Sequence, residues 1–529
     1  MAFATASALD ALGFCALTGA VGCLLLLLHA FAPASAWARK SRKLPPGPRG
    51  LPVLGNALQL PTTFAERALH EWGKTFGDVV YFKIFRTSAI VLNTFETARD
   101  LLDKRSAIYS DRPRLVLLME LLGTRTLPGI PYGERFRKRR KWMFDAAGYK
   151  PTLRGYHDIQ RREVRRLLLK FSRRPEDFKE HVHLYLAGVL LEITFGRSVE
   201  TVDDELVYLA ERAMSGVNYA GRPGSVPVDF IPILKHIPSW LPGFSFKRNA
   251  AVVRRHIEEY LDAGYNAVTS AIAAGNGAPC IFRSVLAEYG GKPTPAEADE
   301  IKGLAVDVYG AGVETSRGVL FTFMLAMTRN TDVLKKAQEE VDRVVGNERL
   351  PDFNDRESLP YINALLEEVY RWNPPLPMAV PHRVMKDDHY QEYDIPAGCM
   401  IIPNIWAMSR DTRYYPRPEE FRPERHLEVD AKAGNDHILP SSFVFGFGRR
   451  VCPGQALADA SIWLAIACIV ALFDILKPVD DTGTEYAPPA TFISAFSSEP
   501  APFACRIVPR SQSADKILDH LDADLVSTA

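Results

Sequence analysis

The first strong pattern in the chain is a nearly continuous apolar run over residues 11–31, which includes five consecutive leucines. A helix of this length crosses a hydrocarbon core of roughly 30 Å. It could be a cleaved signal peptide, an uncleaved anchor or a buried core helix. No Lys or Arg precedes Arg39, and a basic cluster follows the run. The positive-inside rule therefore favours an uncleaved anchor over residues 1–38, with the N-terminus in the lumen and the body in the cytosol.

The segment after this run is basic and rich in proline over residues 39–60, which suits a stiff hinge. Two short runs at residues 79–85 and 89–92 then predict the strands of a hairpin. Most of the remaining pattern has helical periodicity. We expect a mainly α-helical fold with a small β-sheet region, one domain over residues 61–510, and a loose polar tail over residues 511–529.

One predicted helix is long enough to cross the whole domain. Thr294 and Glu297 form a capping box with Pro295 at the first helical position, and the periodicity continues to about Arg329. Such a helix is roughly 50 Å long.

The middle of that helix holds polar residues and a glycine. Asp307, Ala311 and Thr315 share one face at i, i+4 and i+8. Gly312 costs on the order of 1 kcal/mol relative to alanine, so it needs a reason. Either the helix has one polar kink, or Ala311 and Gly312 admit a flat group while the Thr315 hydroxyl diverts a backbone hydrogen bond.

Two further helical stretches carry charge. Glu368 and Arg371 lie at i and i+3 in a helix that stops before Pro374; an exposed pair of this kind contributes only a few tenths of a kcal/mol. The stretch over residues 133–142 is densely basic, which indicates either a solvated face or a docking surface for an anionic partner.

Composition narrows the class of protein. The chain has 529 residues, 64 Lys and Arg against 63 Asp and Glu, and a net charge of +1, which argues against nucleic acid as the main partner. Its seven cysteines are scattered, without a C-x-x-C pair. This pattern favours neither a disulfide framework nor a zinc site, and it suits a reducing compartment.

One cysteine lies in a glycine-rich loop just before an apolar helical pattern. Cys452 follows Gly446, Gly448 and Arg450 and precedes Gly454. A helix N-terminus and nearby arginines favour a thiolate, which is a metal ligand, whereas an isolated cysteine is more often a buried structural residue. The glycines would let the backbone approach a flat cofactor closely, and Phe445 could cover one face of it.

The spacing Phe-x-x-Gly-x-Arg-x-Cys-x-Gly, which begins at Phe445, resembles the heme-binding signature of the cytochrome P-450 superfamily. The flanking stretch is similar to fungal secondary-metabolite members. The resemblance implies a triangular α-helical heme domain behind one N-terminal transmembrane helix. It also implies heme b, with Cys452 as the axial ligand of the iron.

The resemblance extends to other site residues. It implies that Glu314 and Thr315 form an acid-alcohol pair for oxygen activation, and that Glu368 and Arg371 form a buried network with Arg425. It implies that cations meet the heme propionates at four positions, namely Arg112, Arg140, His382 and Arg450. The sequence departs from the family pattern at Phe136, where the family has a tryptophan whose N–H reaches a propionate.

The expected function is that of a membrane-anchored heme-thiolate monooxygenase. It would use O2 and electrons passed from NADPH by a separate cytochrome P-450 reductase, with cytochrome b5 as a second donor, to oxidise a lipophilic, terpenoid-like molecule in fungal secondary metabolism. The expected location is the endoplasmic reticulum membrane, with a single span, a cytosolic catalytic domain and no nucleic acid partner. Four segments should face the substrate: residues 115–122, 307–315, 376–380 and 492–496.

Three questions stay open at this stage. The chain could instead be a heme-thiolate isomerase or dehydratase that does not use O2, or a non-catalytic heme binder. The apolar cluster over residues 230–244 is either a packed loop or a second contact with the membrane.

Overall fold

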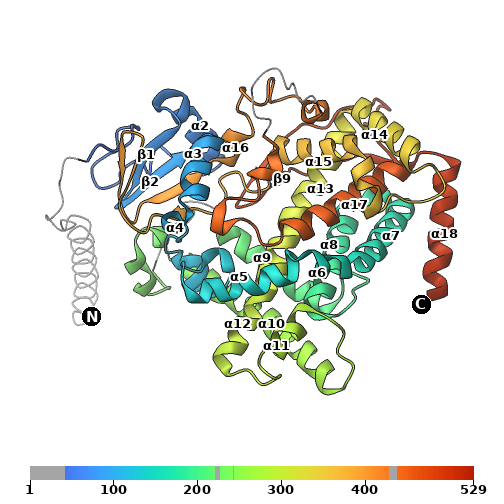
Figure 1. The fold of residues 1–529 in the computed structure, drawn as a ribbon, viewed down its shortest axis with the longest axis horizontal. Helices are drawn as coiled ribbons and strands as arrows, with labels where there is room; N and C mark the ends of the chain where they lie inside the picture. The colour runs from blue at the N-terminus through green and yellow to red at the C-terminus, as the bar shows by residue number, and fades with distance from the viewer. Residues whose placement is uncertain (1–41, 221–226, 242–243, 428–437, 529) are drawn as a thin grey trace, which may run out of the picture.

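The computed structural model describes residues 42–220, 227–241, 244–427 and 438–528. The anchor predicted over residues 1–38 and the first residues of the hinge lie outside the described residues. The described part is mainly helical, as predicted, with small sheets. In Figure 1 the strands β1 and β2 lie at one end of the molecule, and the helices α7, α14 and α18 lie at the other.

The elements are as follows. The first half of the chain contains α2 (Ala65–Phe76), α3 (Phe95–Ala98), α4 (Ser106–Tyr109), α5 (Glu134–Ala147), α6 (Lys150–Gly155), α7 (His157–Arg173), α8 (Phe178–Phe195), α9 (Glu205–Ala220) and α10 (Ser245–Ala273). The second half contains α11 (Ile281–Ala287), α12 (Pro295–Ala305), α13 (Ala311–Arg329), α14 (Thr331–Val344), α15 (Pro360–Trp372), α16 (Ile405–Met408), α17 (Gln455–Leu472) and α18 (Gln512–Thr528). Three segments of the described part are π-helical: η2 (Arg99–Lys104), η3 (Val116–Leu121) and η8 (Val306–Gly310).

The largest described sheet has four strands in the order β1-β2-β6-β3, built from β1 (Val79–Ile84), β2 (Thr87–Leu92), β6 (Met400–Pro403) and β3 (His382–Arg383). β1 and β2 form the predicted antiparallel hairpin, and β2 pairs in parallel with β6. Three two-stranded sheets complete the β structure, from β4 (Asp388–Tyr390) with β5 (Tyr393–Ile395), β7 (Phe473–Leu476) with β10 (Arg506–Pro509), and β8 (Phe492–Ser494) with β9 (Ser498–Pro500).

Helix α17 forms the centre of the helical core. It packs against α7, α13, α14 and α15, and its residues from Ser461 to Leu472 are all buried. Among the described residues, α17 is long and apolar enough to cross a membrane, but most of it is buried inside the protein. A helix that is apolar on all sides is expected in the core of a large domain.

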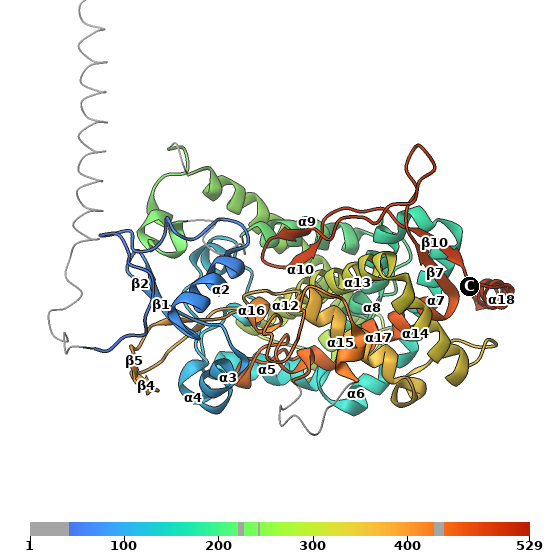
Figure 2. The ribbon, with the colours of Figure 1, turned by 90° about the horizontal axis from the view of Figure 1, so that it is seen from above.

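The C-terminal segment differs from the prediction. Residues expected to form a loose polar tail form α18, which packs against α7 at the far end of the molecule (Figure 2). The buried side chains Ala514, Leu518 and Leu521 follow helical spacing. Because the segment is mostly polar, these apolar positions were not recognised as one face of a helix.

The predicted long helix is also different in detail. It begins at the capping box of Thr294 as expected, but it consists of α12, the π-helical turn η8 and α13 in succession. A π turn holds more residues than an α turn, so the i, i+4 arithmetic fails across it.

Candidate active site

The cysteine loop connects a short 3₁₀ turn, Gly448–Arg450, to the start of α17. The backbone N–H of Cys452 donates to the carbonyl of Phe445 at 2.8 Å, which closes the loop. Burial raises the pKa of the Cys452 thiol, and the backbone N–H groups of Gly454 and Gln455 together with Arg140 oppose that shift. The thiolate therefore has hydrogen-bond donors on the protein side, and it needs a further positive partner to be stable when buried.

Glycines shape this loop. Gly446 and Gly448 have φ of 84° and 53°, in the left-handed region that favours glycine. A Cβ at Gly448 would lie 2.3 Å from the carbonyl oxygen of Leu102 in η2, so the close approach seen at Gly448 is to the backbone of η2. Phe445 packs edge-on against Tyr370, with ring centroids 5.4 Å apart.

Four cationic or basic side chains that the sequence singled out surround one region. Arg112, His382 and Arg450 are buried, and Arg140 is half-buried. Burial, and then the charge of Arg450, lowers the pKa of Arg112. Burial, and then the charge of Arg112, lowers the pKa of His382, whose Nδ1 lies 2.8 Å from the carbonyl oxygen of Tyr109. Buried positive groups that repel one another in this way are stabilised by an anion placed between them.

Arg450 has one buried N–H donor that no described group accepts. Its Nε donates to the carbonyl of Ser110 at 2.7 Å, and its Nη2 donates to the carbonyl of Ile130 at 2.8 Å. Its Nη1 is buried and has no hydrogen-bond partner among the described residues. A buried N–H without an acceptor is rare in folded proteins, so this donor is well suited to a bound carboxylate.

The distal helix α13 begins with Ala311, and Ala311, Glu314 and Thr315 line a large cavity. The Thr315 hydroxyl donates to the carbonyl of Ala311 at 2.7 Å, so it takes a backbone acceptor as predicted. Burial raises the pKa of Glu314, and the charge of Arg317 partly offsets this. A raised pKa brings a carboxyl group closer to the range in which it exchanges protons at neutral pH.

Arg317 was not identified from the sequence. It donates to Glu314 at 2.9 Å and to Glu499 of β9 at 3.3 Å, and thereby links the distal helix to the β8–β9 hairpin. Its position three residues after Glu314 on the same helix is the signal that could have found it.

Two expectations for the distal helix are wrong. Asp307 does not face the cavity, because its carboxylate is turned toward α5, where it pairs with the buried Arg139. The π turn η8 contains Asp307 and moves it off the face of Ala311 and Thr315. Gly312 does not admit a flat group, because its Cβ position would lie 2.7 Å from Leu190 of α8.

The Glu368 network has the form expected from the resemblance. Glu368, Arg371 and Arg425 are buried, and Arg371 donates to both carboxylate oxygens of Glu368 at 2.8 Å. Arg425 donates to the same carboxylate at 3.1 Å, and the His426 ring lies 2.9 Å from it. Burial alone would raise the pKa of Glu368, but Arg371, His426 and Arg425 together hold it at about 2.

The cavity beside Thr315 has a volume of about 660 Å³, within the usual range for small-molecule sites. Its wall is mostly apolar. All four segments predicted to face the substrate contribute to it, the first three through Leu115, Thr315 and Met378, and the last through Phe496.

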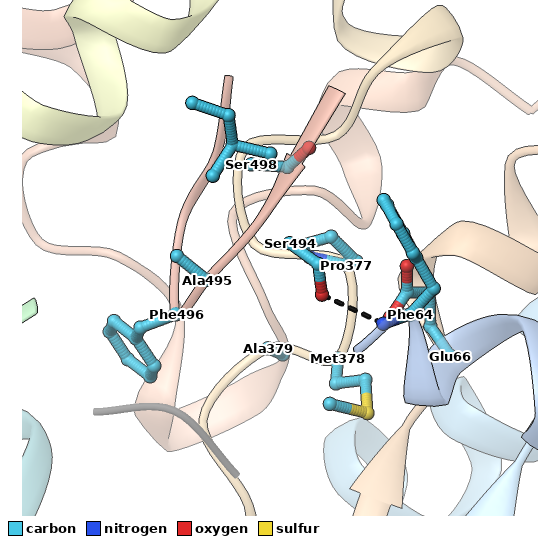
Figure 3. Close-up of a pocket in the computed structure, with 10 residues that line it drawn as sticks. Phe64, Glu66, Pro377, Met378, Ala379, Ser494, Ala495, Phe496 and Ser498 are labelled. Atoms are coloured by element: carbon cyan, nitrogen blue, oxygen red, sulfur yellow. Dashed lines mark hydrogen bonds between the residues drawn. The ribbon is translucent and has the colours of Figure 1, made fainter. Parts of the chain in front are cut away.

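A small neighbouring cavity shares Met378, Ala379 and Phe496 with the large one (Figure 3). Here the backbone N–H of Phe64, at the start of α2, donates to the Ser494 hydroxyl at 2.7 Å. This contact ties the β8–β9 hairpin to the start of α2.

Comparisons with known proteins identify the family of the chain. The cytochrome P450 family model matches residues 45–502. Cytochrome P450 monooxygenase 136 of Postia placenta is 42% identical over 489 residues, which cover 92% of each chain. Cytochrome P450 monooxygenase claR of Ampulloclitocybe clavipes is 40% identical, over 91% of this chain and 90% of the relative. Cytochrome P450 monooxygenase ple1 of Rhodocybe pseudopiperita is 39% identical, over 91% and 92%.

The chain therefore belongs to the cytochrome P450 family. It is a cytochrome P450 monooxygenase, and its cofactor is heme b. The donor set fits that cofactor: a cysteine in a loop of backbone N–H groups, and a cluster of cations with an unused donor for the propionates. The described residues contain no group of three or more His, Cys, Asp or Glu that could hold a metal ion.

Proposed function

We propose that this enzyme inserts one oxygen atom of O2 into a lipophilic small molecule, with electrons that a separate reductase passes from NADPH. The observation that carries this proposal is the pairing of Glu314 and Thr315 on the wall of a large, mainly apolar cavity. An apolar wall selects a lipophilic substrate, and an acid beside an alcohol delivers protons at one point of that wall.

In this proposal each site residue has a stated task. Heme supplies the oxygen chemistry, with Cys452 as its thiolate ligand. Arg112, Arg140, His382 and Arg450 hold the propionates, and Phe445 and Gly448 shape the loop on the cysteine side. Glu368, Arg371 and Arg425 support that loop from behind through their buried network.

The proton steps are assigned to two side chains. Glu314 is assigned as the upstream carboxyl group of the relay; burial raises its pKa, and the charge of Arg317 opposes that shift. The Thr315 hydroxyl, already turned toward the Ala311 carbonyl, passes protons toward the cavity through ordered water. The apolar lining limits the access of other water to this point.

The electron donor is proposed to dock on α5. Arg137, Lys138 and Lys141 are exposed on this helix, one to three residues from Arg140. A basic surface steers an acidic partner toward it, which suits a cytochrome P450 reductase, with cytochrome b5 as a second donor.

A membrane location is proposed from the exposed apolar side chains. Leu58 and Trp240 are 73% and 74% exposed, and Ile233 is also exposed. The segments around them contribute Ala57, Phe230 and Pro232 to the cavity wall. Together with the anchor predicted over residues 1–38, these residues support a single-span protein of the endoplasmic reticulum whose cavity opens near the lipid.

The substrate class is proposed to be terpenoid-like, within fungal secondary metabolism. The relatives are fungal monooxygenases, and the cavity is large enough for a molecule of this kind.

Reconstitution with purified reductase tests the proposal. We expect NADPH consumption that depends on both O2 and an added lipophilic substrate, with one oxidised product per turnover. Conversion of an oxidised substrate without NADPH or O2 would indicate an isomerase or dehydratase instead. Heme binding without any turnover, across extracts from a host that expresses the neighbouring genes, would indicate a non-catalytic heme binder.

A further inference from the structure

A buried ion pair joins α5 to the π turn of the distal helix. The side chains of Arg139 and Asp307 are only 1% and 2% exposed, and Nη2 of Arg139 pairs with the Asp307 carboxylate. Nη1 of Arg139 donates to the backbone carbonyl of Glu300 at 2.9 Å. The guanidinium lies in a slot at Gly303, where a Cβ would be 2.5 Å from Nη1. The helix is therefore built to receive this arginine.

Asp307 ties a third segment to this pair. Its other oxygen accepts a hydrogen bond from the backbone N–H of Leu127 at 2.6 Å and one from the Thr126 hydroxyl at 3.0 Å. Thr126 lines the substrate cavity, as do Val306 and Gly310 at the two ends of the π turn. One carboxylate thus lies directly behind the cavity wall and holds two of the wall's segments against α5.

The π turn itself needs such support. In η8 the N–H of Ala311 points to the carbonyl of Val306, five residues earlier. Single π turns inside α-helices are uncommon and occur mostly at functional sites. Asp307 is the second residue of this turn, so its three contacts act directly on the part of the helix that departs from α geometry.

The next residue of α5 holds the opposite side of the site. Nη1 of Arg140 donates to the carbonyl of Val451 at 2.8 Å, and Val451 immediately precedes Cys452. Adjacent residues of one helix therefore contact the distal helix and the cysteine loop. The separation of these two elements depends on a rigid helical segment rather than on a loop.

We propose that Arg139 and Asp307 form a positioning pair, which fixes the distal helix relative to the cysteine loop and holds Val306–Gly310 in its cavity-lining conformation. This inference rests on the proposed function only in that the ligand binds between these elements. Neither residue touches the substrate; both act through the backbone of the π turn and of residues 126–127.

The test uses the full chain with both partners replaced by apolar residues of similar volume, Arg139→Met with Asp307→Leu. A buried ion pair replaced in this way usually leaves stability intact, whereas the loss of one partner does not. Amide hydrogen exchange is measured for the whole chain, together with imidazole affinity and the Soret band of the reduced, CO-bound protein.

We expect amide exchange at residues 306–311 and 125–130 to become about tenfold faster, and imidazole to bind on the order of tenfold more weakly, as for contacting residues that couple. The thiolate-type Soret band should stay unchanged. Exchange and affinity equal to those of the wild type would overturn the proposal. Faster exchange spread evenly over the chain would also overturn it, because this indicates a general structural role.

A second variant decides the matter if the double variant does not fold. Arg139→Lys keeps the charge, but an ammonium cannot reach Asp307 and the Glu300 carbonyl in the same fork geometry. It should show the same local effects to a smaller degree, and an unchanged exchange pattern in this variant would overturn the proposal.

A matched control comes from an ion pair away from the cavity. Arg162 of α7 pairs with Glu192 of α8, and neither lines the cavity. Arg162→Met should leave residues 306–311 unaffected. The failure of the two proposals is distinguishable, because a wild-type chain that binds no heme would refute the proposed function while the exchange experiment would still test the pair.

Discussion

The guanidinium carbon of Arg450 lies 3.7 Å from the centroid of the Phe136 ring, on the inner face of α5. Phe136 is buried and also contacts Tyr132, with ring centroids 5.6 Å apart. The tryptophan of the family pattern offers an aromatic face and an N–H donor, and Phe136 keeps only the face. The ring fixes a cation whose Nη1 has no protein partner among the described residues.

Replacement of Phe136 by leucine should loosen heme. A cation over an aromatic ring contributes about 0.5 to 2 kcal/mol, depending on how far it is desolvated. We expect Phe136→Leu to release heme roughly 2- to 30-fold faster in transfer to an apoglobin. Phe136→Trp keeps an aromatic face and is the matched control. Equal release rates for the leucine and tryptophan variants would show that the ring merely fills space.

Loss of the Glu368 carboxylate should prevent stable folding. Its removal leaves Arg371 and Arg425 buried without their anion, which typically costs about 3 to 5 kcal/mol. We expect Glu368→Ala to yield little soluble, heme-loaded protein. Lys336→Ala, which breaks the exposed Lys336–Glu424 pair, should cost less than about 1 kcal/mol. A heme-replete Glu368→Ala protein with wild-type stability would contradict this account.

The same carboxylate predicts how stability depends on acid. The folded pKa of Glu368 is held at about 2, below the ordinary value of 4.5. The unfolded chain therefore takes up a proton at this group as the pH falls below 4.5, and the folded chain does so only near pH 2. The contribution of Glu368 to the free energy of unfolding is fully present above pH 4.5. It falls by about 3 kcal/mol as the pH decreases from 4.5 to 2. Denaturant titrations at a series of pH values measure it; a flat profile between pH 4.5 and 2 would be inconsistent with the network.

Cys452 should be required for the thiolate spectrum. We expect Cys452→Ser to lose the thiolate-type Soret band of the reduced, CO-bound protein, because a hydroxyl does not replace a thiolate on heme iron. Cys505→Ser alters a free cysteine that lies outside the loop and is the control. If Cys452→Ser kept heme with an unchanged band, another residue would have to be the ligand.

Removal of the Thr315 hydroxyl should separate electron use from product. Thr315→Ala keeps the apolar wall but removes the group that faces the Ala311 carbonyl. We expect product formation to fall by about 10²- to 10⁴-fold while NADPH consumption continues. Thr315→Ser retains the hydroxyl and should recover much of the product yield. A loss of NADPH consumption in proportion to product would argue against a proton-delivery role.

Much of this architecture could be predicted from local patterns. The β1–β2 hairpin and the start of α12 follow from alternation and from a capping box, both of which depend on neighbouring residues. The burial of Glu368 followed from a resemblance, since its spacing to Arg371 fits an exposed pair equally well. The sequence predicted which segments of the chain line the cavity. It did not predict which side chains within each segment point into the cavity.

The rest depended on contacts between distant parts of the chain. Asp307 was placed by α-helical spacing, but the π turn moved it toward Arg139, which precedes it by 168 residues. The helix α18 was missed because its apolar face consists of only three buried residues in an otherwise polar segment. The role of Gly312, which is to let α13 pack closely against Leu190 of α8, depends on a contact between distant residues.

The adjacency of Arg139 and Arg140 has a practical consequence for recombining this enzyme with its relatives. A crossover inside α5 would join one parent's contact to the distal helix with another parent's contact to the cysteine loop, and insertion of one residue between the two would swing one of them by about 100° around the helix axis. Functional chimeras should therefore inherit α5, η8 and the cysteine loop from one parent as a block, even though α5 and the cysteine loop lie more than three hundred residues apart in the sequence.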